Sequence, residues 1–174
     1  GLDPTKYHVL NVGLIHSNKN QKAIFKVAEQ TSKYPIQYHF IGNHCFLDNS
    51  GITEIQKSLP NCKLWGERND VDKFMSCMDL YFFPSKKELN PLTIKEALSW
   101  DMEVVANYDS NYTDQYKHLS NFNLLQDINI TNYLVNKVTN FSLPETPQNE
   151  IDISFNKGVK VNIKGPTNKK YLVK

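Results

Sequence analysis

The sequence has little that would place it among nucleic-acid-binding, membrane-spanning or secreted proteins. Its 20 Lys and Arg residues nearly balance 18 Asp and Glu residues, and a net charge of +2 gives no electrostatic case for nucleic acid or an anionic membrane. No apolar run approaches the roughly 20 residues that a membrane-spanning helix needs. The opening residues GLDPTKY lack the basic and apolar segments of a signal peptide. We therefore expect a protein without a transmembrane segment.

Cysteine is scarce as well, and metal-ligand spacing is missing. The residues Cys45, Cys62 and Cys77 are odd in number and have no C-x-x-C spacing, which is typical of reduced thiols in a cytoplasmic protein. The five histidines show no ligand spacing either. Asp70 and Asp72 read D-V-D, but Asp70 is placed to cap a helix. We predict no bound metal.

Apolar runs and helical patterns alternate along most of the chain. With 174 residues, the chain can form one full domain with a substantial core. Strict alternation with short connections predicts an α/β fold, a Rossmann-like open parallel sheet with helices on both faces. The strands are expected at residues 7–15, 36–42, 62–66, 79–85, 102–107 and 121–125, and the helices at 21–33, 52–59, 70–78, 91–100, 112–119 and 130–140.

The alternating pattern stops after residue 142. The stretch LPETPQNE (143–150) has two prolines and polar residues, which favours a linker. The remaining residues 151–174 alternate with period two and contain Gly and Pro turns, so they predict a β-rich tail. We divide the chain into a domain at 1–142, a linker at 143–150, and a tail at 151–174 that looks like the truncated start of another domain.

The stretch FFPSKKELNPLTIKEAL (82–98) carries two glutamates, Glu88 and Glu96, with seven residues between them. Glu88 is expected in a loop at the carboxyl edge of the sheet, where open parallel sheets bind ligands. Glu96 is expected in the second turn of the following helix, on the face opposite Ile94 and Ala97. Helical side chains lean toward the helix N-terminus, so Glu96 should lean toward the same edge. Both carboxylates can accept hydrogen bonds from hydroxyls.

The start of that helix has the features of an anion site. Asn90 is a suitable N-cap, and Pro91 suits the first helical position because its φ is already helical. The amides of Leu92 and Thr93 would then point out of the positive end of the helix dipole. A site for phosphate with a hydroxyl-binding carboxylate on either side would fit a ligand that has phosphates in the middle and hydroxylated rings at both ends. A nucleotide sugar has this form. Taken alone, the pair also fits a helix-favouring Glu88 and a solvated Glu96.

The stretch PSKKELNPLTIKEAL (84–98) resembles the Glu–seven residues–Glu motif of family-4-type glycosyltransferases, the glycosyl transferases group 1. In that family the motif follows a strand ending in Pro-Ser, and Ala-Leu or Ala-Met follows the second Glu. The chain is similar to the donor-binding, C-terminal half of such an enzyme over about residues 7–140. The resemblance implies one half of a GT-B fold.

Further marks of the family occur in the expected order. VGLIHSNKNQ (12–21) resembles the first strand and its loop, in which Gly13 is followed six residues later by Lys19. FIGN (40–43) resembles the glycine ending of the second strand, and residues 65–85 resemble the third strand through the fourth. Several motifs in the right order make the resemblance more specific than any one of them.

The resemblance implies roles for individual residues. Glu96 would bind the ribose hydroxyls, Glu88 the donor-sugar hydroxyls, and Lys19 the diphosphate. An ammonium there stabilises the charge that grows on the leaving group. Glu88 and Lys19 are thus the candidate catalytic residues. The other candidate donor-binding residues are Gly13, Gly42, Arg68, Pro91, Leu92 and Thr93.

Two positions depart from the family pattern. Leu14 stands where the family often has an Arg directed at the diphosphate, and His16 or Arg68 are candidates to replace it. Leu89 stands where the family usually has Gly, which restricts the loop and its approach to the sugar.

By this resemblance the chain binds a UDP- or GDP-linked sugar and serves a retaining transfer without a metal or another cofactor. The acceptor-binding half, which precedes the donor half in the family, is absent, so we expect little transfer by this chain alone. By family habit the acceptor is a surface polysaccharide or glycolipid, and the location is cytoplasmic, with peripheral attachment at the inner membrane face left open. Two alternatives remain: a non-catalytic binding or scaffold domain with a degenerate site, and a nucleotide-sugar epimerase.

Overall fold

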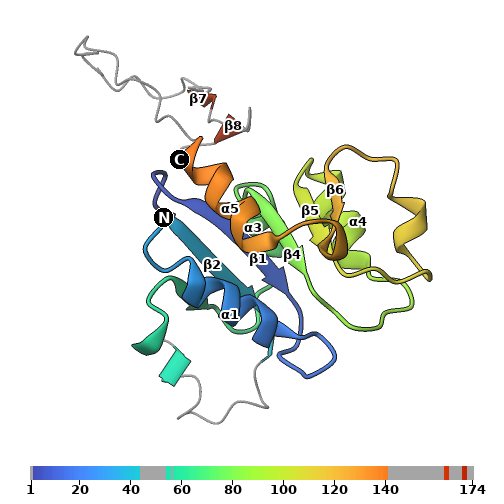
Figure 1. Ribbon diagram of the computed structural model, residues 1–174, viewed down its shortest axis with the longest axis horizontal. Coiled ribbons are helices and arrows are strands. Elements are labelled where there is room, and N and C mark those ends of the chain that lie inside the picture. Colours follow the sequence, from blue (N-terminus) through green and yellow to red (C-terminus); the bar gives the residue numbers. More distant parts are fainter. Residues whose placement is uncertain (1, 44–53, 56, 141–162, 165–169, 172–174) are drawn as a thin grey trace.

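The computed structural model describes residues 2–43, 54, 55, 57–140, 163, 164, 170 and 171. Six strands form one parallel sheet in the order β3-β2-β1-β4-β5-β6, which confirms the predicted Rossmann-like α/β fold (Figure 1). The strands are β1 (Tyr7–Val12), β2 (Ile36–Ile41), β3 (Cys62–Leu64), β4 (Leu80–Phe83), β5 (Glu103–Ala106) and β6 (Phe122–Leu124).

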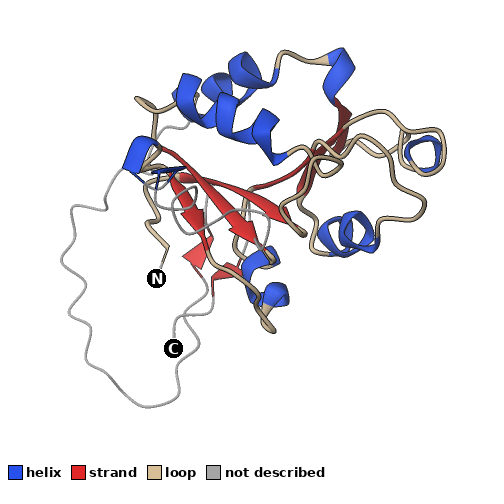
Figure 2. Cartoon of the chain, turned by 90° about the horizontal axis from the view of Figure 1, so that it is seen from below, coloured by secondary structure: helices blue, strands red, loops and turns tan. Residues whose placement is uncertain are grey.

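Helices cover both faces of this sheet (Figure 2). The helices α3 (Val71–Met75) and α4 (Leu92–Ser99) pack on one face, and α1 (Gln21–Gln30) and α5 (Ile130–Thr139) pack on the other. Residues 54, 55, 57 and 58 are also helical, and two short 3₁₀ turns, η1 (Thr113–Gln115) and η2 (Leu125–Asp127), flank β6. Within the described residues, no helix is long and apolar enough to cross a membrane.

Successive side chains along each strand point into the two cores in turn. Because both faces are buried, the strands appear in the sequence as continuous apolar runs. In β4, Tyr81 and Phe83 enter the core under α3 and α4, while Leu80 and Phe82 enter the core under α1 and α5. All four side chains are at most 1% exposed. A parallel sheet buried on both faces has this pattern because helices cover each side.

Two predictions about helix starts were wrong in detail. Helix α4 begins at Leu92, and Pro91 rather than Asn90 occupies its N-cap position, without a side-chain cap. Asp70 does stand at the N-cap of α3, but its carboxylate pairs with Arg68 instead of capping the helix.

The helix predicted at residues 112–119 was also wrong. Only Thr113–Gln115 is helical, as the 3₁₀ turn η1. The amides of Tyr116 and Leu119 each bond to the carbonyl three residues earlier. These tight turns bring the apolar side chains of the segment onto the core, so an apolar stripe at helical spacing did not require an α-helix.

The C-terminal part contains a small antiparallel pair, β7 (Ile163–Lys164) and β8 (Lys170–Tyr171). Ile163 pairs with Tyr171 in its register. The proposed linker at 143–150 lies outside the described residues, and the division of the chain into domains stays a prediction.

Candidate functional site

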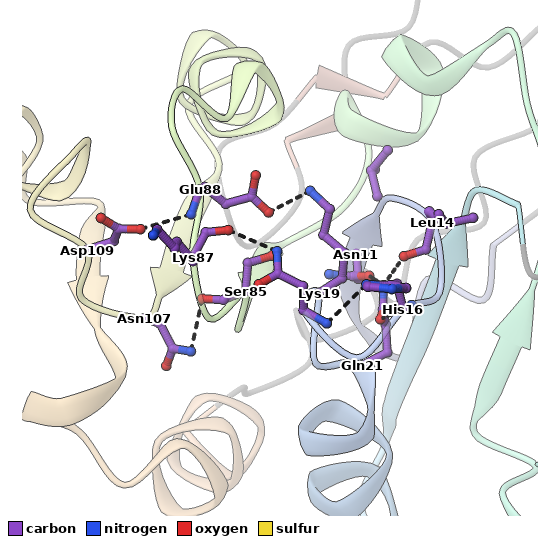
Figure 3. Close-up of polar contacts among 12 residues, drawn as sticks. Asn11, Leu14, His16, Lys19, Gln21, Ser85, Lys87, Glu88, Asn107 and Asp109 are labelled. Atoms are coloured by element: carbon purple, nitrogen blue, oxygen red, sulfur yellow. Dashed lines mark hydrogen bonds and ion pairs between the residues drawn. The ribbon is translucent and has the colours of Figure 1, made fainter. Parts of the chain in front are cut away.

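The order of the strands reverses between β1 and β4, and this is where open α/β sheets bind ligands. From β1 the sheet grows through β2 to β3, and from β4 it grows through β5 to β6. The loop from β1 to α1 and the loop from β4 to α4 therefore leave the carboxyl edge beside one another, as Figure 3 shows. These loops carry Lys19 and Glu88, the two candidate catalytic residues.

Lys19 and Glu88 form an ion pair across this switch point. The Lys19 Nζ lies 2.6 Å from Glu88 Oε1, and the two side chains are 30% and 16% exposed (Figure 3). The ammonium also lies 5.7 Å from the centroid of the Phe83 ring at the end of β4. The sequence placed both residues at this edge, and the structure brings them into direct contact.

Two buried amides, which the sequence analysis did not single out, fix the β1–α1 loop. Gln21 Nε2 donates to Asn11 Oδ1 at 3.3 Å and to the Leu14 carbonyl at 3.0 Å, while its Oε1 accepts the His16 amide at 3.2 Å. Asn11 Nδ2 donates to the Phe82 carbonyl at 2.9 Å. Asn11, a polar residue in the apolar run YHVLNV, was the available signal, because a buried amide needs partners.

The same loop is bonded to the β4–α4 loop on both sides of Lys19. Asn18 accepts the Lys86 amide at its carbonyl at 2.8 Å and donates its Nδ2 to the Lys87 carbonyl at 2.9 Å. Asn20, with φ 56°, donates its Nδ2 to the Pro84 carbonyl at 3.3 Å. Lys19 therefore stands between two anchored residues, which directs its side chain toward Glu88.

Gly13 and Gly42 allow the ends of β1 and β2 to approach closely. Both have positive φ, 149° and 139°, a conformation that favours glycine. A Cβ on Gly42 would lie 2.3 Å from the Gly13 carbonyl oxygen, so no larger residue fits there. A Cβ on Gly13 would meet only the Lys19 side chain, at 3.8 Å. Gly42 also donates its amide to the Gly66 carbonyl, which joins the third strand end to this edge.

The phenol of Tyr81 is buried beside the end of β1. Burial raises the pKa of its phenol, a hydrogen bond with Thr93 opposes that rise, and the charges of Glu96 and Glu88 add to it. The Tyr81 hydroxyl also donates to the Val12 carbonyl at 3.4 Å. Glu96 lies in the second turn of α4, the helix that follows the loop of Glu88. Its side chain is exposed and accessible from solvent.

The other predicted residues divide into two groups. Pro91 is buried, Thr93 is half-buried and Leu92 is 62% exposed at the start of α4, beside Glu88 and Glu96. Arg68 instead donates to both carboxylate oxygens of Asp70, at 2.9 Å each. Arg68 is thus paired with a carboxylate two residues away, and among the described residues no hydrogen bond joins it to Glu88.

The departures from the family pattern lie at the surface of this edge. Leu14 is 37% exposed and Leu89 is 79% exposed. His16 accepts the Asn18 amide at its Nδ1, at 3.2 Å, so it helps to shape the loop around Lys19. Within the described residues, no group of three His, Cys, Asp or Glu side chains could hold a metal ion.

The sequence profile of the glycosyl transferases group 1 family matches residues 6–129. The chain belongs to this family. The match includes all six strands of the parallel sheet and both candidate catalytic residues. A comparison with curated protein sequences finds no match.

Solved glycosyltransferase structures share the fold at low sequence identity. WaaG, which is involved in lipopolysaccharide biosynthesis, has a TM-score of 0.64 at 15% identity over 79% of this chain and 39% of its own. HepE from Anabaena, in complex with UDP and glucose, has a TM-score of 0.63 at 19% identity, over 78% of this chain and 40% of its own. TarM has a TM-score of 0.66 at 21% identity, over 78% of this chain and 29% of its own. The chain thus spans 40% or less of these proteins, and its fold is one half of a GT-B fold.

Proposed function

We propose that this chain is the donor-binding half of a glycosyltransferase and that it binds a UDP- or GDP-linked sugar at the carboxyl edge of its sheet. The observation that carries the proposal is the Lys19–Glu88 pair at the switch point, with Glu96 in the second turn of the helix that follows the Glu88 loop. Lys19 provides a contact for a diphosphate, and the carboxylates of Glu88 and Glu96 are acceptors for hydroxyl groups. HepE, which has this fold, is known in complex with UDP and glucose, and this supports a nucleotide sugar here.

Lys19 is the proposed diphosphate ligand and Glu88 the proposed ligand of the donor sugar. In the chain without ligand, the Lys19 ammonium is neutralised by Glu88 at 2.6 Å. A diphosphate carries more negative charge than a carboxylate, so it replaces Glu88 as the partner of Lys19. Glu88 is then released to accept hydrogen bonds from the sugar hydroxyls. Lys19 stays beside the phosphates and stabilises the charge of the leaving diphosphate as the glycosidic bond breaks.

Glu96 and the start of α4 complete the proposed donor site. Glu96 accepts hydrogen bonds from the ribose hydroxyls, and the amides of Leu92 and Thr93 at the positive end of the helix add donors for the phosphates. Gly13 and Gly42 have no side chains at the ends of β1 and β2, so the nucleotide can approach the backbone there. Arg68 lies on the loop beyond β3 and is the proposed neighbour of the base. It acts there only if the bond to Asp70 opens.

The reaction we propose is a retaining sugar transfer without a metal or other cofactor, in which Lys19 and the helix dipole carry the positive charge. The acceptor is a surface polysaccharide or glycolipid at the cytoplasmic side of a membrane. This proposal rests on family habit and on WaaG, which serves lipopolysaccharide biosynthesis. Because the chain spans at most 40% of the neighbours above, we propose that acceptor binding needs another domain and that this chain alone transfers little sugar.

Calorimetric titration with UDP, GDP, UDP-glucose and GDP-mannose tests the proposal. One nucleotide series should bind, and Glu96→Ala should weaken that binding about tenfold, the effect of losing one hydrogen bond to a charged group. Glu29→Ala is the matched control, because Glu29 is an exposed glutamate on α1, away from the edge. An equal loss in both variants, or no loss in Glu96→Ala, would contradict the assignment of Glu96.

The same titrations separate the two alternatives. A scaffold domain is favoured by the exposed Leu14 and Leu89, and it would bind none of the four compounds. An epimerase would convert a free nucleotide sugar in the absence of any acceptor, which product analysis of the titration mixture detects.

A further inference from the structure

Asp109, in the loop between β5 and η1, contacts the backbone of Glu88. Its Oδ2 accepts the Glu88 amide at 2.9 Å (Figure 3), and its Oδ1 accepts the Asn111 amide at 3.0 Å. The Asn111 side chain in turn donates its Nδ2 to the Glu88 carbonyl at 3.3 Å. Both backbone polar groups of Glu88 are therefore held by one neighbouring loop, 21 and 23 residues further along the chain.

Asp109 is itself held by the core. Its backbone carbonyl accepts the Thr113 amide at 2.9 Å and the Thr113 hydroxyl at 2.8 Å. Thr113 is fully buried and Tyr112 is 1% exposed, so this turn belongs to the packed interior. The Asp109 carboxylate thus links the buried turn to the Glu88 amide, while Asn111 contacts the Glu88 carbonyl.

The neighbouring residues of the β4–α4 loop are held in a similar way. Asn107 Nδ2 donates to the Pro84 carbonyl at 2.6 Å and to the Ser85 carbonyl at 3.1 Å. Asn18 holds Lys86 and Lys87 from the opposite side. The loop has no helix or strand of its own over these residues, so its shape depends on these bonds.

Neighbouring amides and a lysine stabilise the ionised form of the Asp109 carboxyl. The amide of Glu88 holds the pKa of the Asp109 carboxyl below its usual value, and the Asn111 amide and the Lys87 charge lower it further. At neutral pH the residue is therefore an ionised acceptor. A local turn needs only the bond to Asn111, whereas the bond to Glu88 joins two separate loops.

We propose that Asp109 is a positioning residue for the donor sugar: it fixes the Glu88 backbone so that the carboxylate points across the switch point, where it selects a sugar-bearing nucleotide over the bare nucleotide. The inference rests on the proposed function, because Glu88 must contact the sugar. Lys19 and Glu96 meet the diphosphate and ribose in both ligands, and only Glu88 distinguishes them. Loss of Asp109 therefore lowers affinity for the nucleotide sugar without lowering affinity for the nucleotide.

Titration of UDP-glucose and UDP, or GDP-mannose and GDP if that series binds, tests the proposal. Asp109→Ala should weaken binding of the nucleotide sugar about tenfold and change binding of the bare nucleotide less than about twofold. Asp109→Asn keeps a carbonyl acceptor for the Glu88 amide and should restore most of the affinity. Asp114→Ala is the matched control, because Asp114 lies on η1, is exposed and pairs with the nearby Lys117. A general loss of structure would weaken both ligands equally, and this outcome overturns the proposal.

Amide hydrogen exchange provides a readout that does not depend on nucleotide. The Glu88 amide should exchange at least about tenfold faster in Asp109→Ala, while the Phe82 amide inside β4 keeps its protection. Unchanged exchange at Glu88 would show that Asp109 is not its anchor. Faster exchange with an unchanged ratio of the two affinities would leave Asp109 a structural role only, which contradicts the proposal. If the unsubstituted protein binds no nucleotide, the proposed function fails first and this inference with it.

Discussion

Two lysine–glutamate pairs lie at opposite edges of the sheet and are alike in distance and burial. At the carboxyl edge, Lys19 Nζ lies 2.6 Å from Glu88 Oε1, with side chains 30% and 16% exposed. At the amino edge, Lys137 Nζ lies 2.9 Å from Glu103 Oε2, with side chains 39% and 20% exposed. Neither distance nor exposure tells them apart.

The other hydrogen-bond partners of the two glutamates distinguish the pairs. Glu103 also accepts the Tyr133 hydroxyl and, at 3.4 Å, the Asn123 side-chain amide. These bonds fasten α5 to the start of β5 and use the acceptor capacity of the carboxylate. Among the described residues, the Glu88 carboxylate accepts a hydrogen bond from Lys19 alone. A carboxylate has about four acceptor sites, so Glu88 keeps capacity for a ligand where Glu103 does not.

Removing the two lysines should produce the largest difference between the edges. Lys19→Ala removes the cation that meets the diphosphate and should weaken UDP or GDP binding about 10- to 100-fold, the effect of a hydrogen bond to a charged group. Lys137→Ala should change affinity less than about twofold and lower the melting temperature instead, because Glu103 then loses its counter-charge. Calorimetry and thermal unfolding of both variants measure this. Equal losses of affinity would remove the distinction between the edges.

An array built on two buried histidines extends the comparison, because both ion pairs are partly exposed. Trp65 Nε1 donates to His39 Nδ1 at 3.0 Å, His39 Nε2 lies 2.9 Å from His8 Nδ1, and His8 Nε2 lies 2.8 Å from the Asp3 carbonyl. An indole can only donate, so His39 is neutral with its proton on Nε2, and His8 donates to Asp3. The array joins the amino edge to the carboxyl edge with two neutral histidines.

This array should make the protein sensitive to acid. Burial lowers the pKa of His39 to about 3, and burial also lowers that of His8. In the unfolded chain these two histidines bind protons below about pH 6.5, while in the folded chain they stay neutral. Their contribution to the free energy of unfolding is therefore constant above that pH and falls as the pH drops toward 3. His39 alone should cost about 2 kcal/mol at pH 5.

Urea unfolding of the protein and of His39→Gln at pH 5 and pH 8 measures the loss. Glutamine can accept from Trp65 and donate to His8 without titrating, so the variant should lose less stability between the two pH values. The same loss in both proteins would exclude His39 as its source.

Replacing each glutamate by glutamine should give the smallest effects of the series. At the carboxyl edge the change should appear in nucleotide affinity, and at the amino edge in stability. Glu88→Gln removes the carboxylate that competes with diphosphate for Lys19, so affinity for the bare nucleotide should rise about two- to fivefold. Glu103→Gln should leave affinity unchanged and lower the melting temperature by a few degrees. Weaker nucleotide binding in Glu88→Gln would mean that Glu88 does not compete for Lys19.

The sequence predicted what depends on local patterns. The apolar runs at 7–15 and 79–85 indicated strands β1 and β4, and the local pattern placed Glu88 in the loop after β4 and Glu96 in the second turn of the next helix. Contacts between distant segments were not predictable in this way. The direct pairing of Lys19 with Glu88 depends on how two loops meet.

The residues that the sequence analysis missed share this cause. Gln21 and Asp109 look like ordinary polar residues in the sequence, and their roles appear only when partners 10 and 21 residues away come close. Tyr81 reads as a core aromatic, and only the fold brings its hydroxyl to the Val12 carbonyl at the end of β1. The tight turns at 112–119 depend likewise on packing against the core.

Amide chemical-shift mapping with UDP and GDP tests the central claim most directly, because it reports on both edges of the sheet in one experiment. The account predicts shifts that saturate with one nucleotide at the amides of Gly13, Lys19, Glu88 and Thr93. The amides of Glu103, Tyr133 and Lys137, at the opposite edge, should stay in place. Saturating shifts at the amino edge, or none at the carboxyl edge with millimolar nucleotide, would contradict the account.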